Sequence, residues 1–256
     1  MNRPYTCPVQ EYIGRASAYT IGLVIPSLDP LVKQMMGIPD KYASIGIISS
    51  RTGTVTQALA IDDACKAADT DLLKFEMAID AGRQCGQGCL FVIGGASVED
   101  ARRAVQIALD RTDYWVHCLY VNHVGHMECH VTANAGQVLH QIFGVPLGRP
   151  MGILGAAPAG IGLTAVDRAM KEAAVDIVWY GSPSHNLLMM NEFSVAIIGD
   201  LAAVTKAIDC GKAVGCELLN TCGMPLVSVK EAAGACGEES VRTTYTPEVC
   251  RKKPDY

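Results

Sequence analysis

Apolar residues recur along the chain with two alternating periods, which predict strands and helices in turn. Short apolar runs rich in β-branched residues predict strands at Tyr19–Pro26, Ser44–Ser49, Leu72–Met77 and Cys89–Ile93. Apolar positions three and four residues apart predict helices at Asp29–Met36, Val55–Ala68 and Val98–Leu109. The order is therefore strand, helix, strand, helix, strand, strand, helix.

The second half of the chain repeats this pattern, with a predicted strand at Phe193–Ile198 and a predicted helix at Leu201–Val214 among its elements. LVKQMMGIP at Leu31–Pro39 returns 107 residues later as VLHQIFGVP at Val138–Pro146. DDACKAADTDLL at Asp62–Leu73 returns 105 residues later as DRAMKEAAVDIV at Asp167–Val178. A period of this length indicates duplication of a whole domain rather than a short solenoid unit. A duplicated domain presents the same surface twice, whether or not it carries an active site. Assembly is therefore the first functional hypothesis.

The repeat divides the chain into four parts. We expect a polar arm at residues 1–18, a first domain at 19–113, a second domain at 114–222 and a tail at 223–256. The tail loses the apolar period and gains Gly, Glu, Lys and Thr, so we expect it to be mobile.

Composition narrows the function classes. The chain has 256 residues, 50% of them apolar, which suffices for two domains of ordinary size. A net charge of −5 gives no basic face for nucleic acid. No apolar run reaches the roughly 18 residues of a membrane span, and the first residues lack the apolar core of a signal peptide. Eleven cysteines, an odd number, fit a cytoplasmic protein with reduced thiols.

Histidine is the strongest chemical signal. Five of the six histidines lie between positions 117 and 140: His117, His123, His126, His130 and His140. On a strand His126, Glu128 and His130 share one face, and zinc accepts such ligands. The spacing matches no zinc signature, however, so we favour a polar lining of a channel or interface and expect no metal.

Three other chemistries are weaker. MGILGAAPAGIG at Met151–Gly162 leaves a strand and opens a helix, but it is not a GxGxxG nucleotide loop. Cys85 and Cys89 form an isolated C-x3-C, a weak signal for a redox pair or an iron–sulfur ligand. Ser182, Ser184 and His185 share one loop, and neighbours in sequence seldom form a catalytic triad. We therefore expect no enzyme and no cofactor.

Several motifs in order carry a family resemblance. Both copies contain D-x-A-x-K-x-A before an apolar strand, and an extra strand and helix precede that unit in each copy. The segment Asn122–Glu128 is similar to the family stretch N-E-x-G-H-x-E, with His123 in place of the first glutamate. S-P-x-H followed by N-E corresponds to Ser182–His185 and Asn191-Glu192. The chain thus resembles bacterial microcompartment shell proteins with two tandem circularly permuted BMC domains, the PduB/EtuB type.

The resemblance implies an α+β fold in which each domain is an antiparallel sheet flanked by helices. It also implies a homotrimer that forms a flat pseudohexameric tile beside hexameric BMC tiles in the shell of a microcompartment in the cytoplasm. The lysine of D-x-A-x-K-x-A lies at the tile edge in relatives and corresponds to Lys66 and Lys171.

Transport through such a tile runs through gaps lined by loops. A polar lining offers hydrogen bonds to alcohols, diols or aldehydes while binding them weakly enough for release. The candidate pore and ligand-binding residues are Glu76, Asp80, Asn122, His126, Glu128, Ser184 and His185.

Two alternatives stay open. One is a redox-active shell component that holds an iron–sulfur cluster through Cys85 and Cys89. The other is a trimeric metabolite-binding protein that never tiles.

Overall fold

The computed structural model describes residues 11–50, 53–79, 87–187, 190–221 and 226–229. The chain divides into two compact units. The first contains residues 1–79, 87–115 and 133–149, and the second contains residues 80–86, 116–132 and 150–256.

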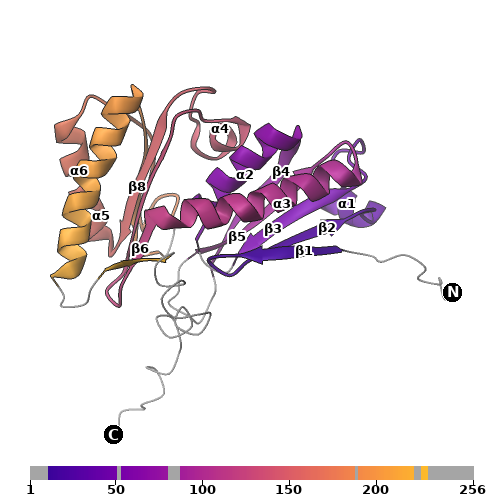
Figure 1. Ribbon diagram of the computed structural model, residues 1–256, viewed down its shortest axis with the longest axis horizontal. Helices are drawn as coiled ribbons and strands as arrows, with labels where there is room; N and C mark the ends of the chain where they lie inside the picture. The colour runs from indigo at the N-terminus through magenta and orange to yellow at the C-terminus, as the bar shows by residue number, and fades with distance from the viewer. Residues whose placement is uncertain (1–10, 51–52, 80–86, 188–189, 222–225, 230–256) are drawn as a thin grey trace, which may run out of the picture. The chain divides into compact units, whose positions relative to one another are not determined.

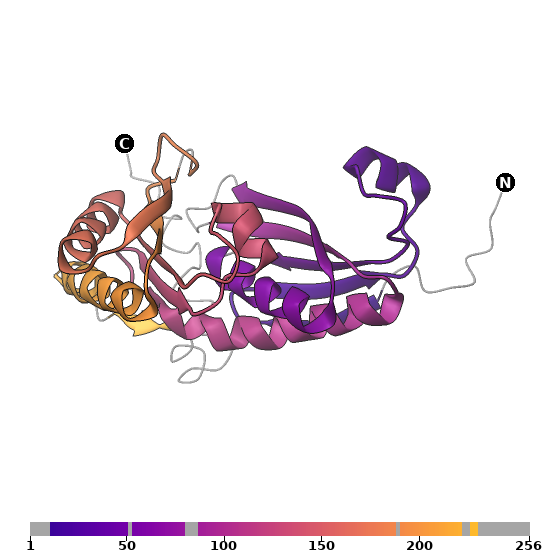
Figure 2. The ribbon, with the colours of Figure 1, turned by 90° about the horizontal axis from the view of Figure 1, so that it is seen from above.

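The first unit is an antiparallel sheet with helices on one face. Its strand order is β1-β2-β3-β5-β4. The strands are β1 Glu11–Ala16, β2 Thr20–Ile25, β3 Ile45–Ser50, β4 Asp71–Ile79 and β5 Gln87–Gly94. The helices formed by the first repeat are α1 Pro30–Met36, α2 Val55–Ala68 and α3 Val98–Trp115. Helix α3 lies across β1, β2 and β3 with α2 beside it (Figure 1). Figure 2 shows α1 at one end of this sheet, away from α2 and α3.

Strand β1 corrects the expectation of a polar arm over residues 1–18. Glu11–Ala16 pairs with β2 as the edge strand of the sheet. Arg102 on α3 binds the Glu11 carboxylate through both Nε (2.6 Å) and Nη2 (2.7 Å). The strand was missed because an edge strand with one half-exposed face carries little apolar pattern, and its ion-pair partner is 91 residues away in the sequence.

The second unit repeats this architecture with a six-stranded antiparallel sheet in the order β11-β6-β7-β8-β10-β9. Its strands are β6 Leu119–Val121, β7 His126–Thr132, β8 Met151–Ala157, β9 Asp176–Gly181, β10 Phe193–Ile198 and β11 Val227–Ser228. Helices α5 (Ala159–Glu172) and α6 (Leu201–Asn220) pack on each other and on this sheet. A short 3-10 turn, η1 (Val116–Cys118), precedes β6. Met127, Leu154 and Ile197 are fully buried beneath these helices.

The start of the tail also differs from the prediction. Val227 and Ser228 pair with Val121 and Tyr120 of β6, and Val229 is only 9% exposed. Val229 packs with Val116, Leu119 and Val121. Two strand residues are too few to form a recognisable period, so the sequence placed them in a mobile tail. The remaining tail residues, 230–256, lie outside the described residues.

One segment of the second repeat packs with the first unit. Residues 133–149 include α4 (Gln137–Phe143), which lies against α2. The Asp62 carboxylate of α2 accepts hydrogen bonds from the backbone N–H groups of Gly136 (2.9 Å), Val138 (3.1 Å) and Leu139 (3.3 Å). Asp62 thus caps a helix whose own N-cap residue is a glycine without a side chain.

Candidate functional site

Strand β7 carries polar residues on one face and apolar residues on the other. Met127 and Cys129 belong to the core beneath α5 and α6. His126, Glu128 and His130 alternate with them and therefore point to the opposite face of the sheet. The prediction that these three residues share one strand face is confirmed.

His126 and Glu128 form a buried polar cluster with Glu192, which immediately precedes β10. His126 Nε2 lies 3.4 Å from Glu192 Oε2, and the two side chains are 18% and 10% exposed. Ser194 Oγ donates a hydrogen bond to Glu192 Oε1. Gly155 of β8 lies between Glu128 and Ser194 in the register of the sheet. A Cβ on Gly155 would lie only 2.0 Å from Ser194 Oγ, so glycine leaves room for the serine hydroxyl.

The three ionisable groups have shifted and mutually dependent pKa values. Burial alone lowers the pKa of His126, but the hydrogen bond and charge of Glu192, together with the charge of Glu128, raise it overall. Burial and the charge of Glu192 raise the pKa of Glu128 to about 7, although His126 opposes this shift. Burial raises the pKa of Glu192, but His126 and the Ser194 hydroxyl outweigh burial and lower it. Near neutral pH the cluster therefore combines a His126–Glu192 ion pair with a proton-exchanging acid, Glu128.

His130 lies deeper in the sheet and is 1% exposed. Burial lowers its pKa to about 3, with a smaller contribution from the charge of His117, so its imidazole is neutral. Within the described residues, no three His, Cys, Asp or Glu side chains are grouped so that they hold a metal ion. The groups of the cluster can donate and accept hydrogen bonds, and Glu128 can exchange a proton near neutral pH.

Asn122 holds the turn between β6 and β7. Its side-chain oxygen accepts from Val124 N (2.9 Å) and Gly125 N (3.2 Å), and its amide donates to Leu219 O (3.0 Å). The turn is thus fixed to the C-terminal end of α6, directly before the His126 cluster. Asn122 has a positioning role in this geometry.

Ser184 and His185 lie in the exposed turn after β9. The His185 ring stacks on Tyr180 with centroids 4.4 Å apart, and Ser182 N donates to His185 O (2.7 Å). Among the described residues, no hydrogen bond, ion pair or ring contact joins Ser184 or His185 to His126 or Glu128. The structure therefore groups only part of the predicted set.

The two remaining pore candidates are not part of this cluster. Glu76 is exposed on β4 of the first unit, opposite Leu90 of β5. Asp80 lies outside the described residues. Glu192 completes the cluster and was absent from the predicted site, although it belongs to the N-E pair that helped to carry the family resemblance.

The two predicted edge lysines have different surroundings. Lys66 Nζ lies 2.9 Å from Asp62 Oδ2 and donates to Asn134 O (2.9 Å). Its side chain is 35% exposed, whereas that of Lys171 is 69% exposed. Among the described residues, Lys171 forms an ion pair only with Asp167 (2.7 Å). Lys66 is therefore anchored in the α2–α4 contact, and Lys171 is solvated.

The cysteine loop is only partly described, because Cys85 lies outside the described residues. Cys89 is 2% exposed in β5, with its Sγ 2.9 Å from Ser50 Oγ. Burial raises the pKa of the Cys89 thiol to about 11, although Ser50 opposes this shift. The thiol is therefore protonated near neutral pH, which disfavours metal ligation.

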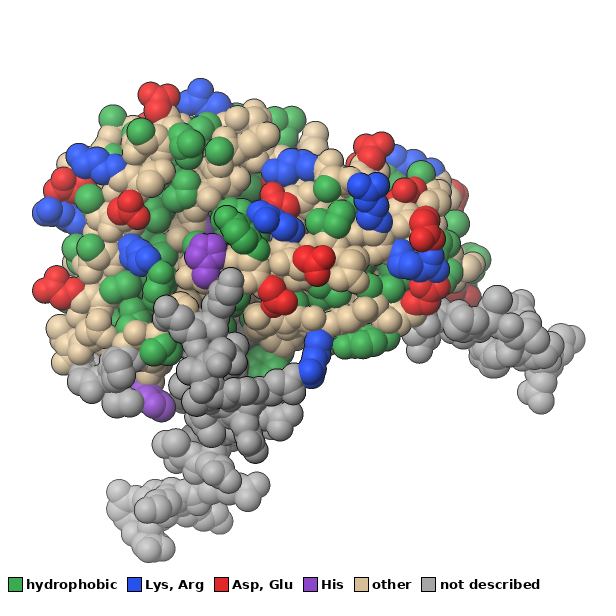
Figure 3. All heavy atoms as spheres, viewed as in Figure 1, with side chains coloured by type: hydrophobic (Ala, Val, Ile, Leu, Met, Phe, Trp, Pro, Cys, Tyr) green, Lys and Arg blue, Asp and Glu red, His purple; other side chains and the backbone are tan. Residues whose placement is uncertain are grey.

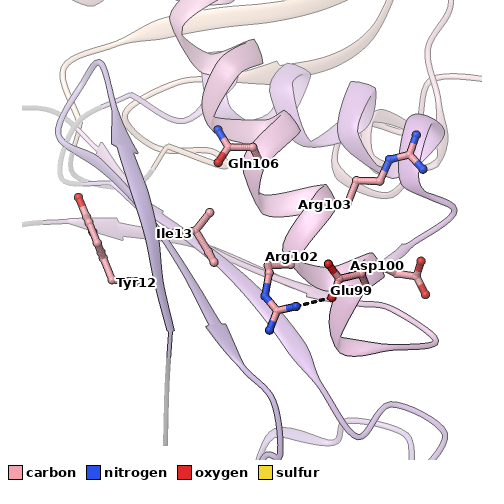
Figure 4. A pocket seen from close by; sticks show the side chains of 7 residues that line it. All are labelled: Tyr12, Ile13, Glu99, Asp100, Arg102, Arg103 and Gln106. Carbon is pink, nitrogen blue, oxygen red and sulfur yellow. Dashed lines mark hydrogen bonds and ion pairs between the residues drawn. The ribbon is translucent and has the colours of Figure 1, made fainter. Parts of the chain in front are cut away.

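Two surface features complete the picture. A shallow hollow between β1 and α3 is lined by Tyr12, Ile13, Glu99, Asp100, Arg102, Arg103 and Gln106 (Figure 4). It contains none of the predicted pore residues, and the Arg102–Glu99 ion pair lies within it. On the face drawn in Figure 3, acidic and basic side chains are interspersed, without a large area of one charge.

No helix in the described parts of the chain is long and apolar enough to cross a membrane.

Comparison with known families decides what this duplicated fold is. The model of the BMC domain matches the chain twice, at residues 44–126 and 151–227. The chain belongs to the BMC-domain family of bacterial microcompartment shell proteins. The microcompartment shell protein PduB of Salmonella typhimurium is 37% identical over 218 residues, which cover 85% of this chain and 81% of that protein.

Solved structures agree with this membership. EtuB from Clostridium kluyveri superposes with a TM-score of 0.82 and 38% identity, covering 85% of this chain and 96% of the other. A trimeric shell protein PduB superposes with a TM-score of 0.80 and 34% identity, with the same coverage. The predicted α+β fold of two BMC domains, the structural rather than enzymatic role and the location in a microcompartment shell are confirmed.

Proposed function

We propose that three copies of this chain close into a pseudohexameric shell tile that lets small neutral polar metabolites pass. The matching of both halves to the BMC domain carries the proposal, because two domains in three chains supply the six positions of a hexagon. Each chain contributes domains whose proposed limits are 19–113 and 114–222. A solved relative is described as trimeric, which supports the same stoichiometry for this chain.

The native mass tests the stoichiometry. A chain of 27.2 kDa should elute and scatter light as a trimer of about three times that mass. A monomer, or a hexamer with true sixfold symmetry, would contradict the proposal.

The His126 cluster, comprising His126, Glu128 and Glu192, supports the transport part of the proposal. It combines a charged pair with an acid that exchanges its proton near pH 7, so it offers both donors and acceptors to a hydroxyl or carbonyl group. The pair is partly exposed, and the Asn122 turn fixes it in place. The charges of His126 and Glu192 compensate each other. An alcohol, diol or aldehyde is therefore bound weakly and released fast.

A crystal of the full chain soaked in 1,2-propanediol or glycerol tests the route. We expect density within hydrogen-bonding distance of His126 or Glu192, and its loss in His126→Ala. His123→Ala, at an exposed position on the same turn, is the matched control and should keep the density. Density confined to the threefold axis would assign transport to the axis and leave the cluster a structural role.

We further propose that Lys171 contributes to the contact between tiles, as the family's edge lysine does. Its side chain is exposed and forms one ion pair along its own helix, so alanine should leave the fold intact. Electron microscopy of mixtures with a hexameric shell partner should show fewer sheets for Lys171→Ala and unchanged sheets for Lys206→Ala. Normal sheets from Lys171→Ala would refute this role, and no sheets even from the wild-type trimer would favour the non-tiling alternative. Lys66 remains the second proposed edge residue, but its alanine variant also loses the Asp62 and Asn134 contacts.

The redox alternative requires an iron–sulfur cluster on Cys85 and Cys89. The burial of Cys89 and its raised pKa disfavour it. Anaerobic purification followed by a visible absorption spectrum distinguishes the two: a colourless trimer supports the transport tile, and cysteine-dependent absorption near 400 nm supports the redox element.

A further inference from the structure

Helix α4 docks on α2 through a buried contact. Val138 and Leu139 of α4 are fully buried, and Asp62 of α2, 2% exposed, binds the N-terminal N–H groups of α4. The contact joins a helix of the second repeat to a helix of the first repeat. It therefore shows how the extra helix of one domain copy packs on another copy.

The duplication supplies a second pair of helices of the same kind. Helix α1 corresponds to α4 at an offset of 107 residues, and α5 corresponds to α2 at an offset of 105. In α2 the positions Ala58, Leu59 and Asp62 are buried. Their counterparts in α5, Leu163, Thr164 and Asp167, are exposed, and Leu163 is 54% exposed. Helix α5 buries a single stripe, Gly162, Ala165, Val166 and Ala169. Its second face therefore lacks the cover that α4 gives to α2.

Helix α1 is uncovered in a matching way. Val32 and Met36 pack against the first unit beside Leu28 and Tyr42. Leu31 and Met35 are 75% and 79% exposed, although the counterpart of Leu31 is the fully buried Val138. Two exposed apolar side chains on one helical turn are typical of a surface that another protein covers.

We propose that α1 of one copy docks on the exposed face of α5 of a second copy, as α4 docks on α2. The occupant is a second copy because the described part of each chain has one uncovered helix and one uncovered face, which a head-to-tail ring satisfies completely. This inference rests on the proposed trimer and names the helices that join it.

The polar end of the proposed α1–α5 contact must differ from that of the α4–α2 contact. A Cβ on Gly136 would lie 2.6 Å from Asp62 Oδ1, and the counterpart of Gly136 is Asp29. Asp167 therefore does not repeat the cap of Asp62. Asp29 caps its own helix instead, accepting from Leu31 N at 2.9 Å.

Disulfide trapping in the full-length protein tests the pairing. The Cβ position of residue 136 lies 3.0 Å from Asp62 Cγ, so the counterpart positions 29 and 167 suit a disulfide. The double variant Asp29→Cys with Asp167→Cys should give covalent dimers and trimers on a non-reducing gel, reversed by reductant. Asp29→Cys with Arg168→Cys is the matched control, because residue 168 lies about 100° further round the helix. Each single variant controls for the eleven native cysteines.

The outcomes separate this inference from the proposed function. A native trimer without the specific cross-link would overturn the helix pairing and leave the trimer intact. A disulfide formed within one chain would show that α1 and α5 meet intramolecularly, which overturns the second copy. A monomeric wild type would contradict the proposed trimer itself. As an independent arm, Leu31→Asp with Met35→Asp should give folded monomers by circular dichroism and light scattering. Leu147→Asp, at another exposed apolar position, should remain trimeric, and a fully trimeric double variant would also overturn the pairing.

Discussion

Replacing Glu128 by Gln should stabilise the protein only at neutral and alkaline pH. The pKa of Glu128 is about 7 in the fold, chiefly because of burial, against 4.5 for an ordinary glutamate. Below pH 4.5 both the folded and the unfolded state hold this proton, so the group has no effect on stability. As the pH rises from 4.5 to 7, the unfolded chain releases the proton while the folded chain retains it, and stability falls. Since each tenfold difference in proton affinity corresponds to about 1.4 kcal/mol, the loss above pH 7 is about 3 kcal/mol.

The variant lacks this loss because glutamine does not titrate. The difference in the free energy of unfolding, Glu128→Gln minus wild type, should therefore rise by about 3 kcal/mol between pH 4 and pH 8. Urea unfolding at one fixed protein concentration measures it, since an oligomer's stability depends on concentration. A constant offset from the new amide does not affect this rise, and contributions of titrating groups outside the His126 cluster cancel. Glu76→Gln, on an exposed face of β4, should show no comparable rise.

A flat difference between pH 4 and pH 8 would refute the reasoning. It would mean that Glu128 is solvated or paired in the assembled protein, so that its ionised form is not penalised. A fall in this difference between pH 4 and pH 8 would mean that a cation stabilises the Glu128 carboxylate more strongly than burial disfavours it.

Three further predictions test other parts of the molecule. Asp62→Ala should lower the free energy of unfolding by about 3 kcal/mol, because it leaves three buried N–H groups of α4 without their acceptor. Asp167→Ala should change it by less than about 0.5 kcal/mol, and equal effects in urea unfolding would contradict this asymmetry. A chain ending after Val229 should keep its melting temperature, and one ending after Cys222 should melt several degrees lower because it loses β11 and the buried Val229; identical calorimetric scans would show that this strand contributes nothing. Cys89 should react with iodoacetamide at pH 7 only after unfolding, owing to its burial and raised pKa; rapid alkylation of the folded protein, seen by mass spectrometry, would show that the thiol is accessible.

Much of the fold was predictable because each main element has a strong local period. The prediction of α2 at Val55–Ala68 and of β10 at Phe193–Ile198 matches the observed bounds. Strands β1 and β11 were missed for a common reason: short edge strands are stabilised by neighbours distant in the sequence, such as Arg102 for β1. Helices α3 and α6 extend to Trp115 and Asn220, beyond the predicted Leu109 and Val214. Polar residues in their last turns mask the apolar stripe there.

The candidate site was predictable only as far as one strand extends. Alternation along β7 placed His126, Glu128 and His130 on one face without any knowledge of the sheet. Glu192 joins them from the position just before β10, placed by the register of β7, β8 and β10, and no local pattern encodes that register. The same limit explains Lys66. The resemblance suggested an edge lysine, but Asn134, 68 residues further along the chain and just before α4, accepts a hydrogen bond from it.

The fate of two equivalent aspartates shows what the duplication has done to this surface. Asp62 and Asp167 occupy the same position of the repeated motif, yet Asp62 is 2% exposed and the Asp167 side chain is 57% exposed. The residue type and the i, i+4 lysine are the same in both, so the helix itself does not decide burial. The difference comes from the neighbouring helix. Helix α4 packs on α2 and binds Asp62, whereas no described helix covers the counterpart face of α5. Tandem fusion therefore satisfies one contact inside the chain and, within the described residues, leaves one helix and one helix face uncovered. In the proposed pairing the copies assemble head to tail, and the rotation between copies decides whether the product is a closed ring or a filament.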